Sequence, residues 1–334
     1  LSNLNTMALT TEQIIGLLRL PKLGRATVLS MVKNAYGENI SLCSASDLYG
    51  YITRYSYTNH SRITMDYSMD EVIKALNEAE EILLKSQSQG IKVVTYFDSL
   101  FPNSLKNIVD TKNNTERDVS PVILYYKGNI ENINQNSAVA IVGSRKAIKE
   151  ALTVSEYLGE AFANANFDIV SGLALGCDAA AHKGALRSNK GKAIAILAHG
   201  LETISPKTNQ DLAEDILSNA GALISEYPVG TKAFKTNFVE RDRLQCGLAS
   251  ASIIIQASID SGTMHVANAS ESNHKLLYAV KYKYDSIMDD DSMSGNKYLL
   301  RTQKAKPISS CNYKDIIEDI KDDESKRLNY GNLL

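Results

Sequence analysis

The sequence predicts an α/β protein in which helices flank an extended, Rossmann-like parallel sheet, with a small all-α domain in front of it. Two patterns lead to this prediction. Beyond residue 90, short β-rich runs alternate with helical stretches, and such alternation is typical of right-handed βαβ crossovers that build a parallel sheet covered on both faces. Before residue 60, the apolar residues recur at helical spacing instead.

The composition is that of a folded protein in water. Of the 334 residues, 44% are hydrophobic and 22% are charged, which is ordinary for a chain with a packed core. No apolar run approaches the roughly 18 residues of a membrane helix, and the first residues lack the pattern of a signal peptide. We therefore expect a cytoplasmic protein without a membrane partner. The net charge of −2 means that a nucleic-acid partner would need a local concentration of Lys and Arg.

Residues 1–66 are expected to form a helical accessory domain. Their apolar residues, such as Ile14 and Val28, follow helical spacing. The domain resembles SAM and helix-hairpin-helix modules, and its turn at residues 20–24 is similar to the helix-hairpin-helix turn, which is lined with glycine and offers backbone N–H groups to a phosphate. Lys22 stands where such turns usually have a second glycine, so a docking role for this domain is the favoured interpretation.

Residues 67–310 are expected to form the Rossmann-like domain, which opens with an amphipathic helix over residues 70–87 capped by Ser68. A polar linker over residues 59–66 precedes it, and residues 110–120 form a surface insertion. The predicted strands cover residues 92–96, 122–126, 139–142, 168–170, 193–197, 222–225, 253–256 and 276–280, and helices are predicted over residues 147–164 and 208–219.

The end of the chain is acidic. Residues 311–334 are expected to form a tail that contains a solvated helix, because charged residues dominate it.

Neither a metal nor a cofactor is expected. Cys43, Cys177, Cys246 and Cys311 lie far apart, without a CxxC pair or a histidine at ligand spacing, which predicts reduced, buried thiols. The chain has no GxxxxGK[ST] loop, no GxGxxG with a downstream acid, no HExxH and no GxSxG. The usual enzymes of this fold are therefore disfavoured, and we expect a protein without catalytic activity.

Polar loops directly follow three of the predicted strands. In a parallel sheet, ligands bind beyond the carboxyl ends of the strands, where loops enter helices. Glycines, hydroxyls and a guanidinium in such loops can hold a phosphate, and the last residue of the third loop is well placed as a helix N-cap. The residues of the three loops are Gly143, Ser144, Arg145, Ser171, Gly172, Ser261, Gly262 and Thr263.

Basic residues accompany these loops. Cations suit phosphates, and aromatic rings suit unstacked bases, so this mixture favours single-stranded DNA as the partner. A solvated charged face over buried phenylalanines is the alternative for the second cluster taken alone. The first cluster is Arg145, Lys146 and Lys149, and the second is Lys232, Lys235, Arg241 and Arg243 around Phe234 and Phe238.

Asp178 and His182 stand four residues apart and could share a hydrogen bond on one helix face. Small residues surround them, which lets the helix pack closely on the sheet. We therefore interpret them as a structural pair at the start of a helix rather than as an acid-base pair.

The order and spacing of four motifs closely resemble the DNA-processing protein A family, also called Smf. The similarity covers roughly residues 90–308. The motifs are Gly143-Ser144-Arg145, Ser171-Gly172-Leu173-Ala174-x-Gly176-x-Asp178-x-x-x-His182, Leu223-Ile224-Ser225-Glu226-Tyr227-Pro228 and Phe238-x-x-Arg241-x-Arg243.

The resemblance implies a homodimer that binds and protects incoming single-stranded DNA and helps to load the RecA recombinase in natural transformation. It also implies a phosphate-binding turn at residues 143–145, a second loop at residues 171–172, a basic wall of Arg241 and Arg243, and a last turn at residues 261–263. Asp242 stands where the family usually has Asn, and Gln256 where it usually has Glu. A carboxylate beside the DNA path predicts that Asp242→Asn tightens binding.

The main alternative is a nucleotide-binding sensor or a phosphoribohydrolase-like enzyme of a related Rossmann-like fold. Those hydrolases use a Pro-Gly-Gly-x-Gly-Thr turn with a glutamate, and this chain has Ser261, Gly262 and Thr263 in a comparable place with Glu271 close behind. The alternative requires the Glu271 carboxylate to lie in the pocket. A third interpretation, an interaction scaffold without a ligand, predicts that the loops at Gly143 and Ser171 tolerate bulky substitutions.

Overall fold

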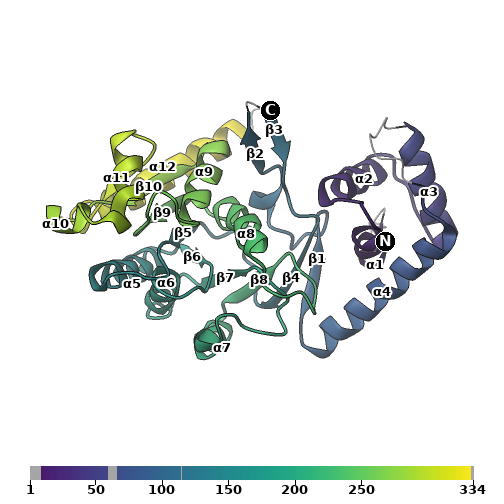
Figure 1. Ribbon diagram of the computed structural model, residues 1–334, viewed down its shortest axis with the longest axis horizontal. Helices are drawn as coiled ribbons and strands as arrows, with labels where there is room; N and C mark the ends of the chain where they lie inside the picture. Colours follow the sequence, from purple (N-terminus) through teal and green to yellow (C-terminus); the bar gives the residue numbers. More distant parts are fainter. Residues whose placement is uncertain (1–8, 59–65, 114, 332–334) are drawn as a thin grey trace.

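The chain forms a nine-stranded sheet with helices on both faces (Figure 1). The computed structural model describes residues 9–58, 66–113 and 115–331. The strands of the sheet are β1 (Lys92–Thr95), β4 (Ile123–Gly128), β5 (Ala138–Val142), β6 (Asp168–Ser171), β7 (Ala193–Leu197), β8 (Ala222–Ser225), β9 (Ala251–Ile254), β10 (Leu276–Val280) and β11 (Lys306–Ile308). Their order is β1-β4-β8-β7-β6-β5-β9-β10-β11.

The run from β8 to β11 is parallel throughout, which confirms the predicted fold class. Only β4 and β1 depart from it, because β4 pairs antiparallel with β8 and β1 antiparallel with β4. The eight predicted strands all form, with ends that lie within two residues of the prediction, and the short edge strand β11 was not predicted.

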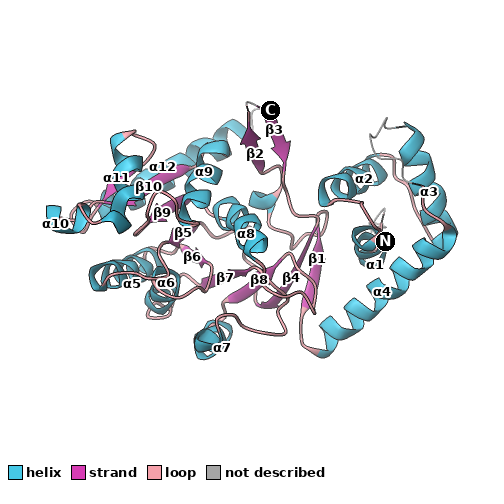
Figure 2. Cartoon of the chain, in the orientation of Figure 1, coloured by secondary structure: helices cyan, strands magenta, loops and turns pink. Residues whose placement is uncertain are grey.

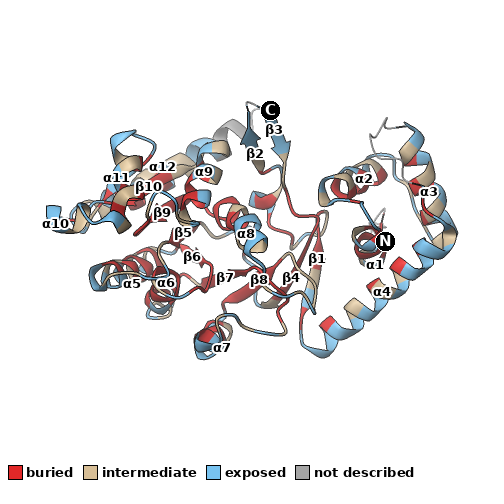
Figure 3. Ribbon diagram, viewed as in Figure 1, coloured by how far each residue is buried: buried red, intermediate tan, exposed pale blue. Residues whose placement is uncertain are grey.

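Helices cover the sheet in two layers (Figure 2). Apolar residues of α5, α6, α7 and α12 pack on one face, and those of α8, α9 and α11 pack on the other. The strands between them are buried almost throughout, as Figure 3 shows. The helices are α1 (Thr11–Arg19), α2 (Arg25–Gly37), α3 (Ala45–Thr58), α4 (Met69–Ser88), α5 (Lys149–Asn164), α6 (Cys177–Ala185), α7 (Gln210–Ser218), α8 (Lys235–Leu248), α9 (Thr263–Ser272), α10 (Asp285–Met288), α11 (Ser294–Arg301) and α12 (Tyr313–Gly331).

The N-terminal helices form one unit beside the β1 edge of the sheet (Figure 1). Ser68 caps α4 in a capping box with Glu71, as its sequence predicts. However, α4 packs along α1 and α3, so the helical unit continues past residue 66 to the end of α4. Lys22, at the position where related turns have glycine, adopts a φ of 62°. The predicted linker over residues 59–66 lies outside the described residues except for Asp66.

The predicted surface insertion is exposed in the structure, whereas the expectation for the acidic tail needs correction. The insertion at residues 110–120 contains an ordered hairpin of β2 (Val109–Lys112) and β3 (Thr115–Asp118). The acidic tail is not a fully solvated helix, because Ile316, Ile317 and Ile320 of α12 are buried against the sheet. These three residues form an apolar stripe at helical spacing.

The cysteines are all free, but Cys43 and Cys311 are exposed rather than buried. Within residues 9–58, 66–113 and 115–331, no helix is long and apolar enough to cross a membrane. The same residues contain no group of three or more His, Cys, Asp or Glu side chains that could hold a metal ion.

The chain order reverses between β5 and β9. From β5 the strands progress through β6 and β7 to β8, and the chain then returns to β9 and continues outward through β10 to β11. The helices that follow β5 and β9 therefore pass to opposite faces of the sheet. A crevice opens at the carboxyl ends of such a strand pair, and ligands of open α/β sheets bind there.

Lys275 secures the end of α8, the helix that borders this crevice. Its Nζ donates hydrogen bonds to the carbonyls of Cys246 (3.0 Å), Gly247 and Ala249 (2.7 Å). Lys275→Met should lower the free energy of unfolding by about 3 kcal/mol, because buried carbonyls would lose their donor. Urea denaturation measures this loss. The matched variant Lys304→Met removes a surface partner of Glu271 and should change stability by less than about 1 kcal/mol; equal effects would contradict the capping role.

Candidate functional site

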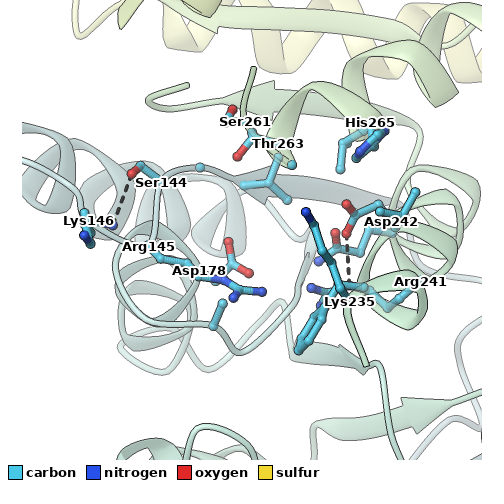
Figure 4. Close-up of a pocket in the computed structure, with 18 of the residues that line it drawn as sticks. Ser144, Arg145, Lys146, Asp178, Lys235, Arg241, Asp242, Ser261, Thr263 and His265 are labelled. Atoms are coloured by element: carbon cyan, nitrogen blue, oxygen red, sulfur yellow. Dashed lines mark hydrogen bonds and ion pairs between the residues drawn. The ribbon is translucent and has the colours of Figure 1, made fainter. Parts of the chain in front are cut away.

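A pocket of about 600 Å³ lies at the carboxyl ends of β5 and β9 (Figure 4). The loops after both strands, Ala174 and Asp178 beyond β6, residues 235–245 of α8 and the first turn of α9 form its walls. The predicted binding residues that line it are Gly143, Ser144, Arg145, Lys146, Lys235, Arg241, Ser261, Gly262 and Thr263. The structure thus brings together residues from segments more than a hundred positions apart in the sequence.

The loop after β5 is locked in place by its neighbours. The Ser144 N–H donates to the Gln256 carbonyl (2.8 Å), which ties the loop to the end of β9. A Cβ on Gly143 would lie 2.7 Å from the sulfur of Cys177. Gly176, with φ of 78°, approaches Ser144 so closely that a Cβ there would lie 2.2 Å from its carbonyl oxygen. Glycine is therefore favoured at both positions, and the loop packs closely against the start of α6 and the end of β9.

Arg145 enters the pocket from this loop, opposite the side chains of α8 (Figure 4). Its guanidinium lies 4.6 Å from the centre of the Phe238 ring, within cation–π distance. No ion pair to Arg145, Lys146 or Lys235 occurs in the described parts of the chain. These three cations are therefore available to an anionic ligand.

The α8 wall carries a buried arginine and a carboxylate. Arg241 donates from Nη1 to the Ile196 carbonyl (2.6 Å) and from Nε to Asp242 (3.1 Å). A Cβ on Gly172 would lie 1.9 Å from the Arg241 guanidinium, so the loop after β6 must have glycine there. Arg241 is thus a fixed part of the wall, and it forms an ion pair with Asp242.

Burial raises the pKa of two carboxyls in the pocket, those of Asp178 and Asp242. The pKa of the Asp242 carboxyl is raised to about 7, chiefly by burial; Arg241 and Arg145 lower it, and the nearby Asp178 carboxylate raises it. Near neutral pH this carboxyl is therefore poised between its neutral and charged forms.

The loop after β9 presents the start of α9 to the pocket. The N-cap residue is Gly262 rather than the predicted Thr263, which is the first residue of the helix. The Ser261 hydroxyl donates to the Ser258 carbonyl (2.7 Å) and so stabilises the turn. The N–H groups of Met264 and His265 donate to the carbonyls of Ser261 (3.1 Å) and Gly262 (2.9 Å). The dipole of α9 still favours negative charge at this end of the pocket.

Four of the predicted binding residues lie outside the pocket lining. The Ser171 hydroxyl is buried and donates to the Ile141 carbonyl (2.6 Å), while the Gly172 N–H donates to Asp178 (3.1 Å). Lys232 is exposed on the loop before α8. Arg243 is bound to both carboxylate oxygens of Glu226 and to the Val119 carbonyl.

The position of Arg243 follows from helix geometry. Residues two apart on a helix point to nearly opposite sides, so Arg241 and Arg243 cannot belong to one wall. The basic wall is therefore Arg241 alone, and Arg243 instead joins an ion-pair group with Glu226 and Arg25 that connects α8 to the N-terminal helices.

The hydrogen bond predicted between Asp178 and His182 does not form. Asp178 points toward the loop after β6, where it accepts the Gly172 N–H. Both ring nitrogens of the buried His182 lack a partner among the described residues, and burial lowers its pKa to about 3. Asp178 thus supports the loop, whereas His182 is a neutral core residue.

Three polar lining residues were not predicted: Gln245, Asp260 and His265. A helical reading of α8 could have found Gln245, because Phe238, Asp242 and Gln245 follow the spacing of one helix face. Asp260 and His265 flank the predicted turn, and no motif in the sequence singled them out.

Glu271, the acid required by the hydrolase alternative, is not in the pocket. It pairs with Lys304 (2.7 Å) on the far end of α9. Gln256 is likewise behind the pocket, where it accepts the N–H of Ile148 at the start of α5 and donates to Ser292. The observed site is thus a polar pocket with several cations in a Rossmann-like protein, and Glu271, which the hydrolase alternative requires there, lies outside it.

Comparison with known proteins assigns the chain to a family. Residues 92–321 match the sequence profile described as DNA recombination-mediator protein A. This match spans more than half of the chain and contains every residue of the pocket. The chain belongs to the DNA recombination-mediator protein A family, as its motifs predicted.

Individual relatives agree with this assignment. The DNA processing protein DprA of Streptococcus pneumoniae is 31% identical over 233 residues, 70% of this chain and 76% of that protein. The protein Smf of Synechocystis is 40% identical over 161 residues, which are 47% of this chain but only 40% of that protein's length.

Solved structures show the same fold. The X-ray structure of DNA processing protein A from S. pneumoniae has a TM-score of 0.71 at 26% identity and covers 90% of this chain and 95% of that one. A structure from Helicobacter pylori, described for its single-stranded DNA binding mode, has a TM-score of 0.57 at 24% identity and covers 70% of this chain and 98% of that one.

Proposed function

We propose that this protein is a recombination mediator that binds single-stranded DNA in the pocket between β5 and β9. The observation that supports the proposal is the convergence of three unpaired cations, Arg145, Lys146 and Lys235, with the N-terminus of α9 on one pocket. Phosphates need such cations and N–H donors. The related protein from H. pylori is described by its single-stranded DNA binding, which agrees with this ligand.

Binding without catalysis is part of the proposal. The two buried carboxylates of the pocket have structural partners, since Asp178 accepts from Gly172 and Asp242 from Arg241. Glu271 is engaged with Lys304 outside the pocket. Asp260 also lines the pocket and forms no ion pair within the described residues. The position of Glu271 therefore disfavours the phosphoribohydrolase-like alternative, because that alternative requires this carboxylate at the ligand.

The cellular role follows from the family. We propose that the protein acts in the cytoplasm during natural transformation, as a homodimer that protects incoming single-stranded DNA and helps RecA to load on it. RecA filament formation on DNA precoated with a single-strand binding protein tests this role. Faster filament formation in the presence of the protein is the expected result, and no acceleration would limit the function to DNA binding.

A competition experiment separates DNA from a small nucleotide as the ligand. Unlabelled oligonucleotides should displace a labelled single strand at concentrations near the dissociation constant, because several phosphates contribute to binding. Mononucleotides, each offering one such contact, should require at least about a hundredfold more. Displacement by one mononucleotide at equal concentration would instead favour the sensor alternative.

A further inference from the structure

Four exposed apolar side chains belong to the pocket lining or to residues next to it in the sequence. Leu175, Phe234, Val239 and Ile259 are exposed by 46%, 60%, 41% and 40%; we call these four residues the apolar rim. Val239 lines the pocket, and each of the others is directly bonded in sequence to a residue that lines it. Apolar surface next to a cationic pocket suits a ligand that combines anionic groups with flat apolar faces.

Phe234 is the most exposed member of the apolar rim and is presented on a fixed backbone. It is the N-cap residue of α8, and its carbonyl accepts the N–H of Asn237 (3.0 Å). The Asn237 side chain in turn donates to the carbonyls of Ala198 (3.2 Å) and Lys232 (3.4 Å). The loop that carries Phe234 is therefore anchored to the end of β7, while the ring itself faces solvent.

The positive charge beside Phe234 favours an anionic ligand at this part of the surface. Lys232 and Lys235 flank it, and neither forms an ion pair within the described ranges of the chain. Phe238, which lies one helical turn further along α8, lines the pocket and stacks with Arg145. Two aromatic rings with interspersed cations thus lead from the pocket to the surface, the alternation that a sugar-phosphate chain with unstacked bases would match.

We propose that Phe234 is a stacking platform for the base next to the nucleotide held in the pocket, with Lys232 and Lys235 beside the adjoining phosphates. The proposal rests on the proposed function, because it extends the same DNA path. Stacking depends on the flat face of a base and little on its identity. Phe234→Ala should therefore weaken binding about tenfold for every base composition and leave the salt dependence unchanged.

The absence of tryptophan from the sequence provides a direct test. In the Phe234→Trp variant, the introduced indole is the sole tryptophan, and stacking of a base should quench its fluorescence. The quenching should saturate with the same dissociation constant that anisotropy gives for the labelled oligonucleotide. The matched control is Tyr57→Trp, at a residue of α3 that is 80% exposed and whose tryptophan fluorescence should not respond to DNA.

The outcomes separate this proposal from the function on which it rests. Binding by anisotropy without quenching at position 234, together with unchanged affinity of Phe234→Ala, would overturn the stacking role and leave DNA binding intact. No binding by the unaltered protein would instead contradict the proposed function. If Phe234→Ala converts a dimer to a monomer in sedimentation velocity without changing DNA affinity, the apolar rim is a contact between copies of this chain, and the stacking proposal is wrong.

Discussion

Replacing Arg145 with alanine should weaken binding of single-stranded DNA about tenfold at low salt, equally for every sequence. The guanidinium reaches the pocket from a loop that Gln256, Cys177 and Gly176 hold in place, and no carboxylate within the described residues pairs with it. Each lost phosphate contact also releases one counterion fewer, so the slope of log affinity against log salt should decrease by about 1. Anisotropy titrations at several salt concentrations measure both quantities.

The control for this variant is Arg117→Ala, which removes the same charge from the exposed β2–β3 hairpin. Its affinity should stay within about twofold of that of the unaltered protein, since Arg117 is exposed and does not line the pocket and solvent and salt screen such charges. Equal losses for both variants would indicate an effect of net charge alone, and unchanged affinity of Arg145→Ala at low salt would contradict the phosphate site.

Replacing Asp242 with asparagine should tighten DNA binding about tenfold at pH 8 and change it little at pH 6. The pKa of the carboxyl is raised to about 7, mainly by burial, so above this pH the side chain is an anion in a pocket that must accept phosphate. Below it, protonation removes the charge. A bound phosphate favours the protonated form further, so the unaltered protein should take up a proton on binding and lose affinity as the pH rises through 7.

Asparagine keeps the shape of the side chain and an oxygen that can accept from Arg241, which makes this variant informative. Its DNA affinity should be nearly independent of pH between 6 and 8. Because imidazoles generally gain a proton in this range, His265→Gln serves as the control and should retain the pH dependence. A pH profile that disappears in His265→Gln and persists in Asp242→Asn would assign the effect to the histidine instead.

Local sequence patterns predicted the fold and most of the pocket, because each strand and its following loop are adjacent in the chain. Strands such as β7 and β10 are apolar runs between turns, and the loop of Gly143 to Arg145 directly follows β5. Once the sheet is parallel, its topology alone brings the carboxyl ends of the strands to one edge. That is why residues 143 and 263 could be assigned to one site without knowledge of any distance.

Features that depend on tertiary contacts could not be predicted in the same way. The sequence around Arg241 and Arg243 does not show that their side chains have different partners. In the structure, Arg241 donates to the Ile196 carbonyl, whereas Arg243 binds Glu226 on the other side of α8. The packing of Ile316 and Ile320 was not predicted, because the acidic residues around them indicated a solvated helix instead. Their spacing is nevertheless that of an apolar stripe on a helix. The hydrogen bond expected for His182 does not form, because no polar group within the described residues bonds to either of its buried ring nitrogens.

The central claim is that the pocket between β5 and β9 binds single-stranded DNA through its phosphates. The most direct test is the anisotropy of a labelled single strand of mixed sequence, titrated at low and moderate salt beside the matching duplex. We predict saturable binding that prefers the single strand and weakens as salt increases. Absence of binding at low salt, or equal affinity for the duplex, would contradict the claim.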